Sequence, residues 1–463
     1  MTEPSRLKPW LWAVLLAPLL AAAGPVSEYT LDNGLRILVK EDHRAPVVVS
    51  QVWYKVGASY EHRGITGVSH VLEHMMFQGT EKHPPGEFSR IIAEHGGEEN
   101  AFTGRDYTAY FQQLEKSRLA ISFELEADRM RHLKLQAERF DKERKVVMEE
   151  RRLRTEDDPQ SLTYETFAAT AYLNGPYHHP VIGWMDDLRD LTLADLRDWY
   201  QRFYAPNNAT LVVAGDVDPD AVHRLAKEHF GPLPAGPEPV VKPREERAQN
   251  GERRVTVRAP AELPYLIMGY KTPVLRSLEE APWKAYALEV LAGVLDGGSS
   301  ARLARELVRG RQIATSASAG YDFASRHDGL LTLSGVPTRE HSVAELEEAL
   351  RGQIRRLQEE LVAAEELERV KAQVAASDVY ERDSVFYQAM QIGMLETVGL
   401  DWRIGPEYVE KVRAVTAEQV RQVAKEYLAP ERLTVAVLEP QPVEGEKAPM
   451  PRAGQAGGDY VRH

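Results

Sequence analysis

The sequence predicts an α+β fold made of two tandem homologous domains, each an α/β-sandwich in which helices cover a mainly antiparallel sheet. The duplication is predicted by a pattern that occurs twice: a capped helix, an Ala-Pro turn and an apolar strand, at residues 191–214 and 415–437, with a constant offset of 224 residues. A second similarity joins residues 53–56 to 269–272 at an offset of 216. Strand-like segments precede helical ones in each copy, which is typical of this fold class.

Length, charge and cysteine content narrow the functional classes. The 463 residues suffice for two domains of about 200 residues each. The formal net charge of −13 argues against a nucleic-acid partner, because phosphate binding requires a basic surface. The chain has no cysteine, which excludes disulfides, thiolate metal sites and a cysteine nucleophile. Histidine, aspartate and glutamate remain as metal ligands.

Residues 1–23 have the pattern of a secretory signal peptide. Arg6 and Lys8 precede an apolar run over residues 9–20, and three alanines precede Gly24. The run is shorter than the roughly 20 residues that span a bilayer, although retention as an anchor stays open. We expect a protein that works outside the cytoplasm, which in a bacterium means the periplasm.

The first domain is expected over residues 24–230. Alternating residues predict strands at 29–39, with a turn at Asp32-Asn33-Gly34, and at 47–56. A polar hairpin is expected between Glu98 and Gln113. Helical periodicity predicts helices at 65–77, 86–95, 117–132, 137–154 and 193–204. Thr192 and Thr416 are expected helix N-caps, and Pro206 and Pro430 follow the two helix ends.

A proline-rich segment over residues 231–250 is expected to be a stiff, solvated linker, because it holds five prolines followed by charged residues. The second domain then covers residues 251–440. Residues 441–463 are expected to be a disordered tail.

A short motif on an apolar helix predicts a metal centre. His70 and His74 lie one helical turn apart, so both imidazoles leave the helix on one face, at a spacing that suits two ligands of a tetrahedral Zn²⁺. Glu73 lies beside them, where it can take a proton from water. Two histidines in the core would be the alternative, but buried imidazoles and a carboxylate are costly without partners.

A third protein ligand is expected from the helix at 137–154. If Val146, Val147 and Leu153 mark its inward side, Glu150 lies within roughly 15° of that direction and is the expected ligand. Glu143, seven residues earlier, is expected to orient a ligand by a hydrogen bond. Glu149 lies roughly 90° away and is expected on the solvated face.

These residues give the chain a resemblance to the pitrilysin/insulinase family of zinc metallopeptidases, in the half-length branch that includes the β subunit of mitochondrial processing peptidase. The resemblance covers almost the whole chain after residue 23, and the segments that carry it are His70 to His74, Glu143, Glu150, Asn100 to Thr103 with Asp106 and Tyr107, 204–208 and 295–303. It implies that residues 98–103 form a sheet edge that accepts the substrate as an added strand, with Asn100 and Ala101 contacting the substrate backbone.

The second half departs from the first and from the family. At the offset of 216, Tyr286 and Val290 replace the two histidines, so we expect one Zn²⁺ per chain. The resemblance also implies an Arg/Tyr pair that holds the scissile carbonyl. Val308 and Thr315 occupy the corresponding positions here, and Arg309, Arg311 or Tyr321 are the candidate substitutes.

The resemblance therefore implies a metalloendopeptidase that cleaves peptides or unfolded polypeptides, bound in extended form, inside a chamber made by two chains. Glu73 is the expected general base. The expected partner is a homologous chain without the zinc motif but with the Arg/Tyr pair, and a homodimer is the alternative. A catalytically silent scaffold or binding subunit of the same fold, or a purely structural zinc, would be the competing functions.

Overall fold

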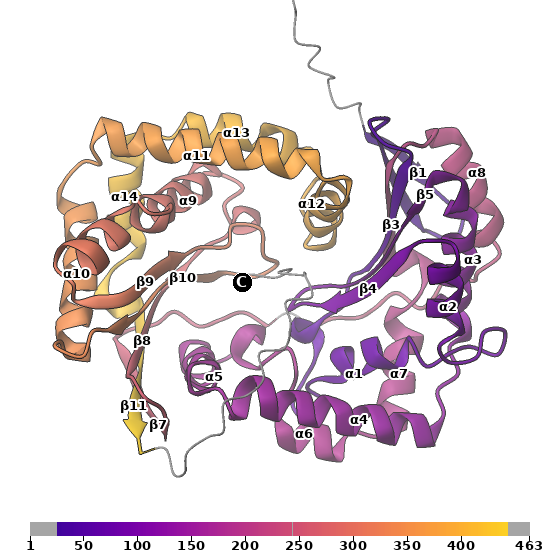
Figure 1. The fold of residues 1–463 in the computed structure, drawn as a ribbon, viewed down its shortest axis with the longest axis horizontal. Helices are drawn as coiled ribbons and strands as arrows, with labels where there is room; N and C mark the ends of the chain where they lie inside the picture. The colour runs from indigo at the N-terminus through magenta and orange to yellow at the C-terminus, as the bar shows by residue number, and fades with distance from the viewer. Residues whose placement is uncertain (1–25, 243, 443–463) are drawn as a thin grey trace, which may run out of the picture.

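The computed structural model describes residues 26–242 and 244–442. Two sheets face each other, with most helices on their outer sides (Figure 1). The signal peptide predicted over 1–23 lies outside the described residues, as does the tail predicted over 441–463 apart from its first two residues, of which Gln441 ends the last strand. No helix in the described ranges is long and apolar enough to cross a membrane.

The first sheet has six strands in the order β1-β2-β6-β3-β5-β4. Only the β2–β6 pair is parallel. Its strands are β1 (Val26–Thr30), β2 (Arg36–Glu41), β3 (Val47–Tyr54), β4 (Glu98–Thr103), β5 (Thr108–Glu115) and β6 (Ala209–Gly215). The strand β4 therefore lies at the edge of the sheet, paired with β5 alone.

The second sheet has five strands in the order β7-β11-β8-β10-β9, and again one pair, β7–β11, is parallel. Its strands are β7 (Arg253–Pro260), β8 (Tyr265–Thr272), β9 (Ala314–Gly320), β10 (Gly329–Pro337) and β11 (Leu433–Gln441). The order β2-β6-β3-β5-β4 of the first sheet is repeated by these five strands, which confirms the predicted fold class, a duplicated mainly antiparallel sheet covered by helices.

The helices of the first half are α1 (Val68–Met75), α2 (Glu87–Glu94), α3 (Leu119–His132), α4 (Ala137–Arg151), α5 (Pro159–Ala171), α6 (Met185–Asp190), α7 (Leu193–Phe203) and α8 (Pro219–His229). Those of the second half are α9 (Trp283–Asp296), α10 (Val343–Glu359), α11 (Ala364–Asp383), α12 (Val385–Thr397), α13 (Ile404–Arg413) and α14 (Ala417–Tyr427). Capping boxes begin α7 at Thr192 and α14 at Thr416, as predicted. In the first half, α5, α6 and α8 were not among the helices predicted from the sequence, and in the second half the only individual helix predicted was the one in the repeat at 415–437.

Each half contributes one helix to the sheet of the other half. The helix α5 packs on β7 and β11, and α12 packs on β3 and β6 (Figure 1). Glycines allow the close approach: a Cβ on Gly269 of β8 would lie 2.5 Å from the ring of Phe167 on α5. A Cβ on Gly393 of α12 would lie 2.1 Å from the ring of Trp53 on β3. The exchange joins the two halves through fully buried aromatic side chains.

The segment between the two sheets is bound to the protein near its end. Glu246 accepts hydrogen bonds from the backbone N–H groups of residues 173–175 and from Lys271. Although burial opposes ionisation, these donors lower the pKa of Glu246 to about 2. Gln249 is buried and donates to the carbonyl of Leu433 at 2.7 Å. The expectation of a solvated linker therefore does not hold for its last residues.

Candidate metal centre

The helix α1 is fixed at its N-terminus by a buried carboxylate. Glu61 accepts hydrogen bonds from the backbone N–H groups of Gly67 at 2.7 Å and Ser69 at 2.9 Å, at the helix end where donors lack intrahelical partners. Burial raises the pKa of Glu61 to about 8, although both N–H groups act against the shift. The apolar residues Val68, Val71 and Leu72 are buried, so the helix has little freedom to rotate.

His70, His74 and Glu150 converge, because α1 packs against α4. Each offers one ligand atom, and these atoms lie within 4.8 Å of one another, in the only such group among the described residues. Glu150 Oε2 lies 3.5 Å from His74 Nε2 and 3.8 Å from His70 Nε2. The imidazole rings are nearly perpendicular, with centroids 4.9 Å apart.

This geometry fits a tetrahedral Zn²⁺. Ligand bonds of about 2.0–2.1 Å keep tetrahedral ligand atoms about 3.4 Å apart, close to the separations from Glu150 to the two imidazoles. Burial, together with the neighbouring His74, lowers the pKa of His70 to about 4. His70 is therefore neutral near pH 7, in the form that binds metal. Two imidazoles and one carboxylate leave one tetrahedral position for water or substrate.

Glu143 is placed to orient His74. The Nδ1 atom of His74 lies 3.4 Å from Glu143 Oε2, and Gln78 donates to the other carboxylate oxygen at 3.2 Å. Burial acts to lower the pKa of His74, but the hydrogen bonds and charges of Glu150, Glu73 and Glu143 outweigh it and raise the pKa. A carboxylate on Nδ1 directs Nε2 toward Glu150.

Glu73 lies beside the three potential ligands without being one of them. It is half-buried and accepts a hydrogen bond from the hydroxyl of Thr103, the last residue of β4. Burial raises the pKa of Glu73. The contact of Thr103 with Glu73 was not predicted from the sequence, although the hydroxyl at the end of the segment Asn100 to Thr103 was a signal for it.

Glu150 is also paired with Arg154, whose Nη1 lies 2.8 Å from Glu150 Oε1. The hydrogen bond with His74 lowers the pKa of Glu150, and the charges of His70 and Arg154 add to the shift, although burial opposes it. Arg154 lies on the π-helical turn Arg152–Glu156 that follows α4. The predicted helix at 137–154 therefore changes its geometry just after Glu150.

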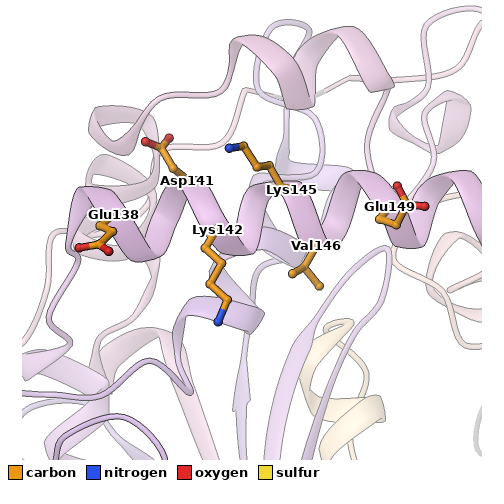
Figure 2. Close-up of a pocket in the computed structure, with 6 residues that line it drawn as sticks. All are labelled: Glu138, Asp141, Lys142, Lys145, Val146 and Glu149. Atoms are coloured by element: carbon orange, nitrogen blue, oxygen red, sulfur yellow. The ribbon is translucent and has the colours of Figure 1, made fainter.

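The prediction that Val146, Val147 and Leu153 mark the buried side of α4 is wrong for two of them. Val147 is buried, but Val146 is 42% exposed and Leu153 is 61% exposed. Around the helix axis, Glu150 lies between the buried Val147 and the exposed Val146 and Leu153. Figure 2 shows Val146 and Glu149 leaving α4 in different directions. The Glu149 side chain is 59% exposed, as expected.

Asn100 and Ala101 lie in the edge strand β4, one end of which contacts α1. The side-chain oxygen of Asn100 accepts a hydrogen bond from the backbone N–H of Ala101 at 2.9 Å. The backbone N–H of Ala101 at the sheet edge is therefore bonded to a side chain of the same strand.

The second half has no equivalent metal centre among the described residues. Tyr286 is buried with its ring near those of Phe323 and Tyr408, and Val290 is fully buried. Between them lies Glu289, at the offset of 216 from Glu73, which was not singled out from the sequence. Burial raises the pKa of Glu289 to about 7.

The residues at the positions of the expected Arg/Tyr pair make other contacts. Val308 is half-buried against the second core, and Thr315 donates to the carbonyl of Val336 at 3.2 Å. Tyr321 donates to the carbonyl of Pro273 at 2.7 Å, and Arg309 donates to the carbonyl of Ser299. Arg311 is exposed. Of the three candidate substitutes, Tyr321 and Arg309 are thus engaged within the second half.

Known proteins share both the sequence pattern and the fold. Residues 36–183 match the insulinase family (peptidase family M16), and residues 190–374 match the peptidase M16 inactive domain. The zinc protease PqqE of Helicobacter pylori is 37% identical over 62% of this chain and 65% of its own length, slightly less than two thirds. An uncharacterised zinc protease of Streptomyces coelicolor is 29% identical over 90% of both chains.

A solved structure of a protease from Helicobacter pylori superimposes with a TM-score of 0.85 at 29% identity, covering 90% of this chain and all of that one. Both family matches, the relatives and the shared fold agree with the resemblance found in the sequence. The chain therefore belongs to the insulinase family, peptidase family M16.

Proposed function

We propose that this protein is a zinc-dependent endopeptidase. The observation that carries the proposal is the convergence of His70, His74 and Glu150 from α1 and α4, with Glu73 beside them. Family membership and the zinc protease relatives support peptidase activity. A purely structural zinc is disfavoured, because three protein ligands with an adjacent carboxylate are typical of catalytic sites.

His70, His74 and Glu150 would hold one Zn²⁺ per chain, and Glu143 would keep His74 in the binding orientation. Bound zinc would supply a Lewis acid that acidifies water and polarises a peptide carbonyl. Glu73 then takes a proton from the attacking water and returns it to the leaving amine. The raised pKa of Glu73 suits both steps, and the Thr103 hydroxyl holds its carboxylate in place.

The substrate is a peptide or unfolded polypeptide in extended form. It would pair with the open side of β4 as an added strand, which binds main chain with little dependence on sequence. A substrate carbonyl would replace the side chain of Asn100 on the N–H of Ala101. The end of β4 carries Thr103 next to Glu73, so a strand bound there leads toward the metal centre.

We propose further that the site is completed by a second chain of the same fold, in the periplasm if residues 1–23 act as a signal peptide. Val308 and Thr315 stand where a carbonyl-holding Arg and Tyr are expected, and Arg309 and Tyr321 already bond to backbone carbonyls. A partner without the zinc motif but with the pair would supply these donors. A homodimer that uses Arg311 is the alternative.

Zinc content and peptide cleavage measured together test the function. The purified chain is assayed with unfolded peptides of differing length, alone and with a candidate partner, before and after removal of metal by a chelator. We expect about one Zn²⁺ per chain, cleavage that stops on chelation and returns with zinc, and activity that depends on the partner. A zinc-loaded pair without cleavage would indicate a scaffold. Full activity from a symmetric dimer of this chain alone would contradict the heterodimer.

A further inference from the structure

The turn between β4 and β5, residues 104–107, is held by a buried carboxylate. Asp106 is 4% exposed, and its Oδ1 accepts a hydrogen bond from the hydroxyl of Ser59 at 2.6 Å. Its Oδ2 accepts from the hydroxyl of Tyr177 and from the backbone N–H of Arg326 at 3.0 Å. The Tyr177 hydroxyl in turn accepts from the backbone N–H of His327 at 3.0 Å. One carboxylate thus joins three segments that are distant in sequence.

Arg326 and His327 belong to the second half, in the segment between β9 and β10. The Arg326 guanidinium carbon lies 3.9 Å from the centroid of the Tyr60 ring, and its Nη1 lies 3.4 Å from the Ser59 hydroxyl. The half without metal ligands therefore contacts the first half directly at this turn.

The helix α12 supports the same hairpin on one face. Phe102 of β4 and Tyr107 of the turn pack with Trp53 in an apolar cluster that includes Ala389 and Ile392 of α12. The second half therefore holds the β4–β5 hairpin both at its turn and on its face.

The turn directly follows, in sequence, the residue that bonds to the proposed general base. Thr103, which donates to Glu73, directly precedes Gly104. The Gly104 carbonyl accepts from the N–H of Ala58 at 3.2 Å, and the Arg105 carbonyl accepts from the N–H of Ser59 at 2.7 Å. A shift of the turn would move Thr103, and with it the Glu73 carboxylate and the open edge of β4.

We infer that Asp106 is a positioning residue through which the second half fixes the substrate strand and the general base. This inference rests on the proposed function, because it takes β4 as the strand that binds substrate. It assigns a task in catalysis to the half that lacks metal ligands.

Asp106→Asn is a nearly isosteric test. An amide has one acceptor oxygen, so its nitrogen would face either the Ser59 hydroxyl or the N–H of Arg326 and the Tyr177 hydroxyl. A misplacement of about 1 Å can cost about a hundredfold in rate. We expect kcat/KM to fall ten- to a hundredfold, chiefly in kcat, with zinc content unchanged. The control is Asp198→Asn, whose side chain is 64% exposed on α7 and should change neither quantity.

Tyr177→Phe is the second variant, since it removes the hydroxyl that joins Asp106 to His327. We expect a smaller loss of kcat/KM in the same direction, and less than additive effects in the double variant. Hydrogen exchange provides a measurement that does not need activity. Residues 98–107 and 321–328 should both exchange faster in Asp106→Asn, in the presence of zinc.

An unchanged kcat/KM in a folded, zinc-loaded Asp106→Asn protein would overturn the inference. Faster exchange confined to residues 98–107 would overturn the link to the second half. Failure of the proposed function is distinguishable, since the wild type and Asp198→Asn would then also lack zinc-dependent cleavage.

Discussion

The helices α1 and α9 occupy equivalent places in the two halves and differ in what they carry. His70 and His74 of α1 meet Glu150, whereas the equivalent Tyr286 and Val290 of α9 are packed in an apolar core. Five strands have the same order in both sheets, including one parallel pair in each, and the first sheet adds β1 at its edge. The comparison teaches that the scaffold folds with or without metal ligands. The metal centre is therefore a local addition to a duplicated fold.

The largest expected effect concerns the glutamates of α4. Glu150→Gln should lower zinc affinity by about a thousandfold or more, because an amide oxygen replaces the charged ligand. Glu149→Gln is the matched control one residue away and should be nearly silent. Zinc competition with a chromogenic chelator measures both. The reverse behaviour of the two variants would show that Glu149 is the ligand.

The exchanged helices test whether the two halves depend on each other equally. Phe167→Ala removes a fully buried ring of α5 that packs on the second sheet. Trp53→Ala removes a fully buried ring of the first sheet on which α12 packs. Each should lower the free energy of unfolding by about 3–5 kcal/mol. Chemical denaturation followed separately in each half measures the effect. A single unfolding transition is expected in both variants. Independent unfolding of the two halves would contradict the idea that each half stabilises the other.

A smaller effect on zinc affinity is expected at Glu143, whose carboxylate contacts His74 Nδ1. Glu143→Gln keeps the shape but weakens the acceptor for His74 Nδ1, so zinc affinity should fall about ten- to a hundredfold. The same competition experiment measures it. A loss as large as that of Glu150→Gln would indicate that Glu143 itself binds the metal.

An effect on stability alone, and none on the metal centre, is expected at Glu289, the counterpart of Glu73. Its pKa is raised from 4.5 to about 7 by burial, so the fold favours the protonated carboxyl. Its contribution to stability is complete below about pH 4.5 and is lost as the pH rises through about 7. The difference in stability between Glu289→Gln and the wild type should therefore shift in favour of the variant by about 3 kcal/mol between pH 4 and pH 8. Unfolding measured at both pH values checks this, and an equal effect at both would contradict it.

The elements around the metal centre were predictable because they are local. The spacing of His70 and His74 and the caps at Thr192 and Thr416 depend only on helix geometry. The exchange of α5 and α12 was not predictable, because periodicity shows that a helix has a buried face but not which sheet covers it.

The side chains of α4 illustrate the same limit. The averaged direction of Val146, Val147 and Leu153 did select Glu150, although Val146 and Leu153 are exposed. In a sequence, exposed apolar residues cannot be distinguished from core residues, because the hydrophobic pattern does not show whether an apolar side chain is covered. The contacts of Asp106 with the second half were hidden for a related reason, since they join residues that lie 220 positions apart.

The most direct test is to compare Glu73→Gln with Glu289→Gln, the same substitution at equivalent positions of the two halves. Both proteins should hold about one Zn²⁺ per chain. Glu73→Gln should lose peptide cleavage by several orders of magnitude, because an amide cannot relay the proton, and Glu289→Gln should keep it. Substantial cleavage by zinc-loaded Glu73→Gln would contradict the assignment of Glu73 as the general base.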